Sequence, residues 1–362
     1  MFIIHVVHRV CMSGRAASWW HREETNVRCE LCPHRCSIPD GAVGLCGVRR
    51  NEGGRLLASS YGRVCVRNLD PIEKKPLFHF HPGTLVHSFG TFGCNLDCDN
   101  CQNYELVRAC SGGASMTPLE AVNEAVEHGA QGIAFTFNEP VTWYEFVLDT
   151  CAEARSRGLY TVLNTNGYIQ REPAEELCRH VDAMNVDVKA FDERTYRSTC
   201  GGGLGPVLDT CLAARNVGVH VELTYLLIPG LNDSPDEISR FVRWAVDSMG
   251  PDVPIFFYRF RPFYRLADLP EQSMERMREA AALATGAGAR YVYFGGVAED
   301  NRNTLCPVCS TVVIERRGAE STGKVCFKGS EVSRFCPSVS DVRVNLQDGR
   351  CPTCGEHIPV AL

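Results

Sequence analysis

The most constraining feature of the sequence is an alternation of strand-like and helix-like segments between residues 85 and 295. Short runs rich in β-branched and aromatic residues are separated by amphipathic segments, which is typical of strand–helix units around a parallel sheet. A full eight-unit barrel needs roughly 250 residues, so this shorter stretch predicts an α/β fold with a partial, (βα)6-type TIM barrel. The predicted strands are LVHSF (85–89), GIAFTF (132–137), YTVLN (160–164), AMNVDV (183–188), VHVELTYLL (219–227), PIFFYRF (254–260) and YVYFG (291–295).

Two of the intervening helices have recognisable first turns. The segments TPLE (117–120) and SPDE (234–237) each combine a hydroxyl cap, a proline in the first turn and a glutamate at the third position. We therefore expect helices to begin at these two segments.

The cysteines divide the chain into parts. Twenty cysteines without a recognisable secretory signal indicate a reducing compartment, where clustered thiols bind metal, and we expect a cytoplasmic protein. We expect a disordered tail (1–18), an N-terminal Cys-rich segment (19–80), the partial barrel (81–300) and a C-terminal zinc-ribbon-like extension (301–362).

Charge and hydropathy exclude two classes of partner. The net charge is −6, with no long run of either sign, so a nucleic-acid partner is not expected. No apolar run approaches the roughly 20 residues that a membrane span needs, so a membrane protein is not expected either.

Three cysteines follow the first predicted strand with the spacing Cys94-x3-Cys98-x2-Cys101. Four thiolates would complete a structural zinc site or bind every iron of a cubane cluster, whereas three leave one position free for another ligand. Active sites of such barrels lie at the carboxyl ends of the strands, which is where this loop is expected. The alternative is a zinc site completed by His87 or Cys110.

Polar residues also follow several other predicted strands. FNEP follows the second strand, NTNGY follows the third, LLIPGLND ends the fifth, and Asp187 and Lys189 share one face of the fourth. Each alone has an ordinary explanation as a helix start, a turn or a structural ion pair. Their recurrence at successive strand ends indicates a binding site. The candidate residues are Asn138, Glu139, Asn164, Asn166, Asp187, Lys189 and Ile228.

Together these segments resemble the radical S-adenosylmethionine (radical SAM) superfamily. The resemblance implies a [4Fe–4S] cluster on Cys94, Cys98 and Cys101. FNEP, NTNGY and LLIPGLND resemble the segments that contact the methionyl amino group, the ribose and the adenine of SAM. Asp187 and Lys189 resemble the Asp-x-Lys pair near the methionyl carboxylate in activating enzymes of glycyl-radical proteins.

The resemblance also implies a reaction. Three thiolates leave one iron free to bind the amino and carboxylate groups of SAM. Reduction by one electron, from a donor such as flavodoxin or ferredoxin, cleaves SAM to a 5′-deoxyadenosyl radical that abstracts hydrogen from a substrate. Asp97 and Asp99 on the loop add negative charge and are expected to keep the reduction potential low.

A narrower resemblance covers nearly the whole chain from about residue 19 onward. CELCPHRCSIPDGAVGLCGVR, DPIEKKPLFHFHPG, GCNLDCDNCQN and the cysteine-bearing tail are similar to the radical SAM enzymes of the AMMECR1–Memo–radical SAM system, which are related to the pyruvate formate-lyase activating enzyme. AMMECR1-like and Memo-like proteins are therefore expected partners. The segment IFFYRFRPFY departs from that family, with Phe256 and Arg261 where histidines are usual, so a different substrate or none is an open alternative.

Two further cysteine sets lie outside the predicted barrel. For the N-terminal set a closed zinc knuckle is favoured over an auxiliary iron–sulfur cluster, with His34 as a spare ligand. For the C-terminal set, CPVC and CPTC favour a zinc ribbon over a rubredoxin-like iron site, and Cys326 and Cys336 are unassigned. The sets are Cys29, Cys32, Cys36 and Cys46, and Cys306, Cys309, Cys351 and Cys354.

The segment DPIEKKPLFHFHPG (70–83) has two possible roles, a solvated linker or part of the substrate side of the site. Three functions remain open. The first is a radical enzyme acting on an unidentified small molecule or peptide. The second is an activase of a glycyl-radical enzyme, and the third is a non-enzymatic metal-binding module.

Overall fold

The computed structural model describes residues 14–109, 111–297, 302–317 and 341–362. Its centre is an eight-stranded sheet with the order β16-β15-β14-β13-β12-β11-β9-β8. In this sheet β9 and β11 to β16 run parallel in sequence order. Strand β8 pairs antiparallel with β9 at one edge. The bounds are β8 (Val66–Pro71), β9 (Leu85–Gly90), β11 (Gly132–Phe135), β12 (Tyr160–Thr165), β13 (Ala183–Asp187), β14 (His220–Leu227), β15 (Ile255–Arg259) and β16 (Val292–Gly295).

Seven of these strands are the seven predicted from sequence, and the α/β partial-barrel prediction is confirmed. The edge strands β8 and β16 are not neighbours in the sheet, so the described strands form an open barrel. The antiparallel strand β8 was not predicted.

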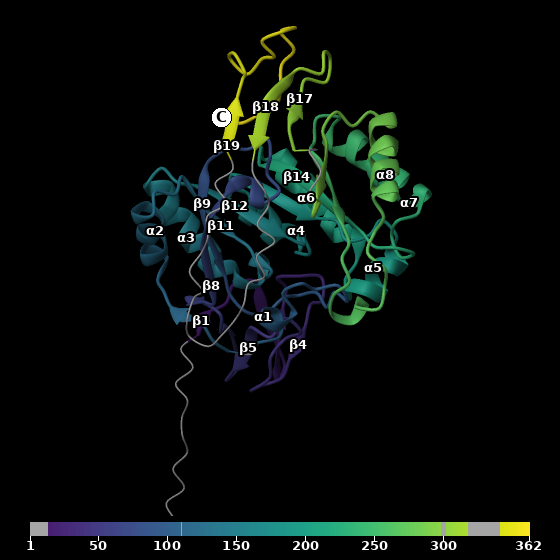
Figure 1. The fold of residues 1–362 in the computed structure, drawn as a ribbon. Helices are drawn as coiled ribbons and strands as arrows, with labels where there is room; N and C mark the ends of the chain where they lie inside the picture. Colours follow the sequence, from purple (N-terminus) through teal and green to yellow (C-terminus); the bar gives the residue numbers. More distant parts are fainter. Residues whose placement is uncertain (1–13, 110, 298–301, 318–340) are drawn as a thin grey trace, which may run out of the picture.

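Helices connect the parallel strands and pack against them (Figure 1). The two predicted first turns are confirmed: the Thr117 hydroxyl accepts a hydrogen bond from the Glu120 amide, and the Ser234 hydroxyl accepts one from the Glu237 amide. The helices are α1 (Tyr104–Arg108), α2 (Pro118–Glu127), α3 (Tyr144–Ser156), α4 (Arg171–Cys178), α5 (Glu193–Cys200), α6 (Leu204–Asn216), α7 (Pro235–Trp244) and α8 (Met274–Gly286).

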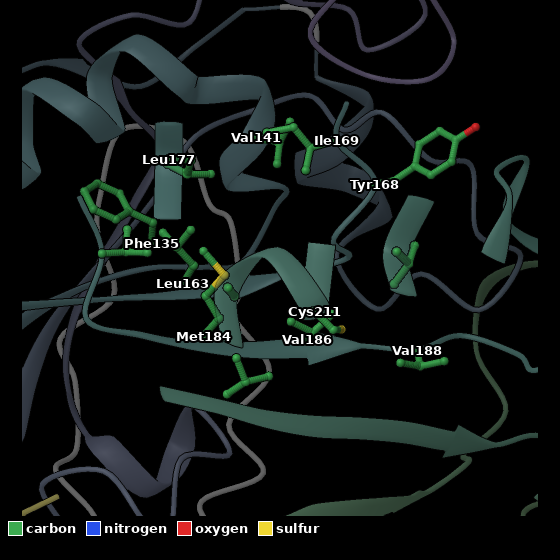
Figure 2. Packing of buried hydrophobic residues seen from close by; sticks show 14 of the residues in the cluster. Phe135, Val141, Leu163, Tyr168, Ile169, Leu177, Met184, Val186, Val188 and Cys211 are labelled. Atoms are coloured by element: carbon green, nitrogen blue, oxygen red, sulfur yellow. The ribbon is translucent and has the colours of Figure 1, made fainter. Parts of the chain in front are cut away.

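Side chains on the helix-facing side of the sheet form the main core. Figure 2 shows Phe135, Leu163 and Met184, which come from three adjacent strands, close to Leu177 of α4. All four are at most 3% exposed. Burying a side chain of this size contributes about 1.5–3 kcal/mol, so this layer stabilises the scaffold that carries the strand ends.

The concave side of the sheet is filled by the segment that precedes β9. Leu77 and Phe80 pack against Val86, Ala134 and Val162, which alternate along their strands with the helix-facing residues. The interpretation of this segment as a solvated linker is therefore wrong for its central part.

Polar residues of the same segment are buried too, and each is paired. Lys75 is 3% exposed, and its ammonium group lies 2.7 Å from a carboxylate oxygen of Asp70. The amides of Phe78 and His79 donate hydrogen bonds to the carboxylate of Glu222, in β14. These contacts satisfy groups that would otherwise be costly to bury.

A small β unit precedes the barrel, and Figure 1 places its strands β1, β4 and β5 near α1 at one end of the molecule. Its three-stranded sheets have the orders β1-β6-β5 and β2-β3-β4, and β7 pairs with β10. Because β1 pairs with β6, the predicted tail at 1–18 is wrong for residues 14–18, and residues 1–13 lie outside the described chain. The bounds are β1 (Arg15–Ala16), β2 (Trp20–Glu23), β3 (Asn26–Cys29), β4 (Ser37–Ile38), β5 (Arg49–Glu52), β6 (Arg55–Ala58), β7 (Arg63–Val64) and β10 (Ala114–Ser115).

The C-terminal unit lies at the opposite end (Figure 1) and contains β17 (Thr304–Leu305), β18 (Val312–Arg317) and β19 (Asp341–Val344). Arg316 of this unit is 7% exposed, lies 4.3 Å from the Phe78 ring centroid and forms an ion pair with Glu73. Phe80 forms a parallel bridge with Ala361, so the end of the chain pairs with the segment inside the barrel.

One predicted domain boundary differs from these contacts. The boundary at residues 80 and 81 separates β8 from its partner β9, although both belong to the central sheet. The boundary at residues 300 and 301, like Cys326 and Cys336, lies outside the described residues. No helix in the described ranges is long and apolar enough to span a bilayer.

His79 provides a test of how the C-terminal residues are joined to the barrel. Its ring nitrogens lie 3.1 Å from the Pro359 carbonyl and 2.7 Å from the Tyr293 hydroxyl, and burial lowers its pKa to about 4. Since the unfolded chain protonates near the ordinary value of 6.5, stability is lost as pH falls through this window.

We predict that the free energy of unfolding declines between pH 6.5 and pH 5 with a contribution approaching about 1.4 kcal/mol per pH unit, and that His79→Gln removes this contribution. Denaturant titrations across the pH range measure the slope. His21→Gln removes an exposed histidine and serves as the control. Equal slopes for His79→Gln and the wild type would contradict the prediction.

Candidate functional site

The three cysteines Cys94, Cys98 and Cys101 lie on the loop between β9 and α1, at the carboxyl end of β9. All three are partly buried. The amides of Asp97 and Asp99 donate hydrogen bonds of 2.9 Å to the carbonyls of Cys200 and Thr199, at the end of α5. A neighbouring helix therefore holds the backbone of the loop.

The surroundings of the thiols suit anionic sulfur. The Leu96 amide lies 3.4 Å from Cys94 Sγ, and Asn166 Nδ2 lies 3.8 Å from the same atom. Burial raises the pKa of Cys94 and Cys101, whereas the nearby Lys189 ammonium group lowers both values. Bonding to a metal deprotonates a coordinating thiol outright, so burial does not prevent ligation.

Asn138, from the FNEP segment, holds the start of this loop. Its side-chain oxygen accepts a hydrogen bond from the Thr91 amide at 3.0 Å, and its Nδ2 donates to the Gly93 carbonyl at 3.1 Å. Gly93 has φ +86°, and a Cβ there would lie 2.7 Å from the Cys46 carbonyl oxygen. The loop thus requires glycine at this close approach to the N-terminal unit.

Glu139 connects the FNEP and NTNGY segments. Its carboxylate accepts hydrogen bonds from the Asn166 amide, the Thr165 hydroxyl and the Val141 amide, at 2.7, 2.7 and 2.9 Å. Burial raises its pKa to about 7, although these three donors favour the ionised form. Glu139 therefore joins the ends of neighbouring strands β11 and β12.

The two asparagines of NTNGY differ in how fully they are paired. Asn166 donates to the side-chain oxygen of Asn95 at 2.9 Å and accepts from the Tyr168 amide at 2.8 Å. Asn164 Nδ2 lies 3.3 Å from the Lys75 carbonyl, and its buried Oδ1 has no hydrogen-bond partner among the described residues.

Asp187 and Lys189 form an ion pair of 2.6 Å at the end of β13. Burial acts to lower the pKa of Lys189, but the Asp187 carboxylate and the neighbouring thiols raise it above its ordinary value. Asn232 links this pair to Ile228, because its Nδ2 donates to the Lys189 carbonyl and its Oδ1 accepts from the Ile228 amide. The structure therefore brings the LLIPGLND turn to the same site.

Two expectations for the cysteine loop require correction. Asp97 and Asp99 were expected to add net negative charge, but both form ion pairs with Arg265, and Asp97 also pairs with Arg108. The arginines offset that charge. His87, the proposed fourth ligand of a zinc site, instead contacts Glu124 of α2 at 3.2 Å.

The alternative ligand Cys110 lies outside the described residues. His87, Glu124 and His128 form a separate group whose potential ligand atoms lie within 4.8 Å of one another.

One neighbour of the loop was not predicted. Cys200 was interpreted as a packing residue, but its thiol forms a hydrogen bond with Cys98 that lowers the pKa of Cys200 and raises that of Cys98. Its separation of about 100 residues from the three-cysteine motif left no spacing signal. The contact arises only because α5 ends beside the loop.

Comparison with known proteins assigns the family. The sequence matches the family model described as the radical SAM superfamily over residues 89–243. It is 38% identical over 353 residues to an uncharacterized protein of Methanocaldococcus jannaschii, MJ0808, a match that spans 96% of this chain and 100% of that protein. The chain belongs to the radical SAM superfamily.

More distant relatives include activating enzymes. The pyruvate formate-lyase-activating enzyme of Clostridium pasteurianum is 27% identical over 154 residues, which span 41% of this chain and 64% of that enzyme. Among solved structures, a domain of pyruvate-formate lyase-activating enzyme from Bacteroides vulgatus aligns over 46% of this chain and 99% of that chain, with 18% identity and a TM-score of 0.40.

Family membership identifies the chain as a radical SAM enzyme that uses SAM and a [4Fe–4S] cluster. The third hypothesis, a non-enzymatic metal-binding module, is therefore wrong. The residues on the loop after β9 fit this cofactor pair, because three thiols lie there beside two nitrogen donors and Lys189.

Phe256 and Arg261 of the segment IFFYRFRPFY lie in different surroundings. Phe256 is 1% exposed and packs on the concave side of the sheet, with its ring centroid 4.8 Å from that of Phe78. Arg261 is exposed beyond the end of β15 and pairs with Glu271. At these positions Phe256 packs in the core, and Arg261 forms an ion pair at the surface.

The other two cysteine sets do not belong to this loop. The C-terminal cysteines gather with all four ligand atoms within 4.8 Å of one another, so they could hold one metal ion. The N-terminal cysteines line a pocket where the small β unit meets the barrel, since Asn95, Val141 and Thr142 line it too. His34, the spare ligand, lies in the same pocket and contacts the Asn95 carbonyl at 2.7 Å.

The hydrogen bonds of Glu139 lead to a stability prediction. Glu139→Ala leaves two amides and one hydroxyl without their buried acceptor, so we expect a loss of at least about 2 kcal/mol in the free energy of unfolding. Anaerobic denaturant titration measures it. Glu153→Ala, at an exposed position on α3, is the matched control and should change stability by about 0.5 kcal/mol or less. Equal effects of the two substitutions would show that Glu139 is not a structural link.

Proposed function

We propose that Cys94, Cys98 and Cys101 hold the [4Fe–4S] cluster of this radical SAM enzyme. The observation that carries the proposal is the placement of three thiols at the carboxyl end of β9, beside the Asn166 amide group and Lys189. When bound, the cluster and SAM supply one-electron cleavage of SAM and abstraction of hydrogen from a substrate.

The predicted SAM-binding residues divide into two groups. Asn138, Glu139 and Asn166 have side chains already paired with protein groups, so we assign them to positioning the loop and the strand ends. Asn164 retains an unpaired oxygen, and Asp187 and Lys189 are partly exposed, with side-chain exposures of 38% and 22%. We assign these three, with the turn at Ile228, to direct contact with SAM.

We propose an unidentified polar small molecule or peptide as the substrate. Ser88 Oγ is buried and has no hydrogen-bond partner among the described residues. Ser88 is two residues after Val86 in β9, so both side chains point to the concave side of the sheet. There Val86 packs against Leu77 and Phe80. Unpaired buried oxygens favour a ligand that offers hydrogen-bond donors.

The setting of the reaction follows from the resemblance and the composition. We propose a cytoplasmic enzyme, because twenty cysteines in this arrangement suit a reducing compartment. A flavodoxin or ferredoxin would deliver the electron. AMMECR1-like and Memo-like proteins are the proposed partners, and neither a nucleic acid nor a membrane is expected.

A second candidate is an activase that abstracts hydrogen from a glycine of a partner enzyme. The ion pair between Asp187 and Lys189, matching the Asp-x-Lys pattern of activating enzymes, favours it. The two candidates differ in a simple observation. An activase requires a glycyl-radical protein encoded in the same genome, and absence of such a protein leaves the first candidate.

The cluster assignment is tested by Cys98→Ala. Removing one of three ligands should lower the cubane Mössbauer signal by one cluster per chain and lower 5′-deoxyadenosine formation from SAM and dithionite by at least about 100-fold. Anaerobic Mössbauer spectroscopy and chromatography measure the two quantities. Cys211→Ala, which removes a buried thiol in α6, is the control and should keep both. Full 5′-deoxyadenosine formation by Cys98→Ala would refute the assignment.

We also propose that the C-terminal set holds zinc. In the structure, Cys306 Sγ lies 3.5 Å from Cys354 Sγ, and Cys309 Sγ lies 3.5 Å from Cys351 Sγ. Four thiolates around one Zn²⁺ with bonds of about 2.3 Å would stand about 3.8 Å apart, close to this spacing.

Cys351→Ser should lower the zinc content by about one atom per chain and leave the iron content unchanged. It should also lower the thermal midpoint, because Cys351 belongs to the apolar cluster with Phe78 and Tyr293. Elemental analysis and calorimetry measure these outcomes, with Cys98→Ala as the control that should keep its zinc. Undiminished zinc in Cys351→Ser would rule out this site.

A further inference from the structure

The two four-cysteine sets of this chain have different geometries. In the C-terminal set, all four ligand atoms lie within 4.8 Å of one another. Among the described residues, the N-terminal cysteines do not form such a group, and neither do the three cysteines of the loop after β9. The N-terminal set therefore differs from the set that gathers around a single point.

The N-terminal cysteines surround a pocket. All four line it, together with apolar side chains that include Leu31, Ile38 and Val141. Thiolates around a single zinc ion lie about 2.3 Å from the metal and therefore close to one another. Thiolates of a cubane bind different irons and stand further apart from one another. Thiols that line one pocket without converging on a single point fit the wider spacing of a cubane.

Backbone hydrogen bonds hold the segments that carry these four cysteines. Cys29 ends β3, and its amide donates a 3.0 Å hydrogen bond to the carbonyl of Cys36, directly before β4. Cys46 lies on the opposite turn, where the Gly44 amide donates to the Arg49 carbonyl at 2.7 Å. Two hydrogen-bonded turns therefore present the thiols from separate sides of the pocket.

Arg49 adds a cation that is only partly satisfied. It is 1% exposed and lines the pocket, and its two terminal nitrogens pair with Glu145 at 2.8 and 3.1 Å. Its Nε has no hydrogen-bond partner among the described residues. A buried N–H beside thiols suits an anionic sulfur acceptor.

We propose that Cys29, Cys32, Cys36 and Cys46 hold a second [4Fe–4S] cluster, in place of the zinc knuckle favoured from sequence. Four thiolates would occupy every iron, so this cluster would have no position for SAM and its chemistry would be electron transfer. The inference goes beyond the proposed function and does not depend on the cluster at Cys94.

The position of the pocket suits such a role. Asn95, directly after Cys94, lines it, and His34 on the pocket side contacts the Asn95 carbonyl. The close approach of Gly93 to the Cys46 carbonyl joins the two loops at a second point. One electron leaving a reduced cluster here would oxidise that cluster and reduce its neighbour, with no proton or bond change required.

The test counts metals in the full-length protein after anaerobic reconstitution with iron and sulfide. We expect about eight irons and one zinc per chain, against about four irons and two zincs if the N-terminal set binds zinc. The wild-type count needs no substitution, so a variant that fails to fold cannot obscure it. Four irons with two zincs would overturn the proposal.

The triple variant C94A/C98A/C101A separates this inference from the proposed function. We expect it to keep about four irons per chain and a [4Fe–4S] Mössbauer spectrum, with an EPR signal in the reduced state that added SAM does not change. Adding Cys32→Ala should remove that iron and leave one zinc. A triple variant with zinc and no cubane would overturn the inference, even if the wild type cleaves SAM.

Arg49→Lys tests the cation at the pocket. It keeps the positive charge but removes the Nε donor, so the midpoint potential of the cluster in the triple variant should fall relative to that of the Arg49 form. Arg171→Lys, at an exposed ion pair on α4, is the matched control and should leave the potential unchanged. An unchanged potential in Arg49→Lys would show that no cluster lies against Arg49.

Discussion

The candidate site depends on hydrogen bonds that hold the cysteine loop from outside. Between Gly90 and Tyr104 the chain has neither helix nor strand, so its backbone groups must pair elsewhere. Asn138 binds the start of the loop through the Thr91 amide and the Gly93 carbonyl, and the end of α5 binds its middle. Three thiols can converge on one cofactor because two separate parts of the barrel hold their backbone.

The filling of the barrel explains where a substrate can enter. The segment with Leu77 and Phe80 occupies the concave side near the start of the strands, and Arg316 of the C-terminal unit packs over Phe78. Figure 1 shows the C-terminal unit at one end and α1, which follows the cysteine loop, toward the other. The proposed substrate must therefore reach the site from the end that carries the loop, between the carboxyl ends of the strands.

The sequence predicted local features well. The seven parallel strands follow from β-rich runs, and the starts of α2 and α7 follow from hydroxyl caps, because both depend on neighbouring residues. The strand-end motifs FNEP and NTNGY do lie beside one another, as the Asn166–Glu139 hydrogen bond shows, since parallel strands bring their carboxyl ends to one edge. Contacts between segments that are far apart in the sequence were not predicted. No pattern pairs Cys200 with Cys98, or Arg265 with Asp99, and only the folded chain brings them together.

Burial of charged groups was equally hard to predict, because it depends on partners elsewhere in the chain. DPIEKKPLFHFHPG looks solvent-exposed by composition, yet Lys75 is buried against Asp70, and the Glu222 carboxylate accepts from two backbone amides of this segment. Isolated, each charge would oppose burial, whereas each pair satisfies both members. The same principle governs Arg49. Glu145 satisfies two of its nitrogens, which allows the guanidinium group to lie beside thiols that need a positive charge nearby if they are to ionise.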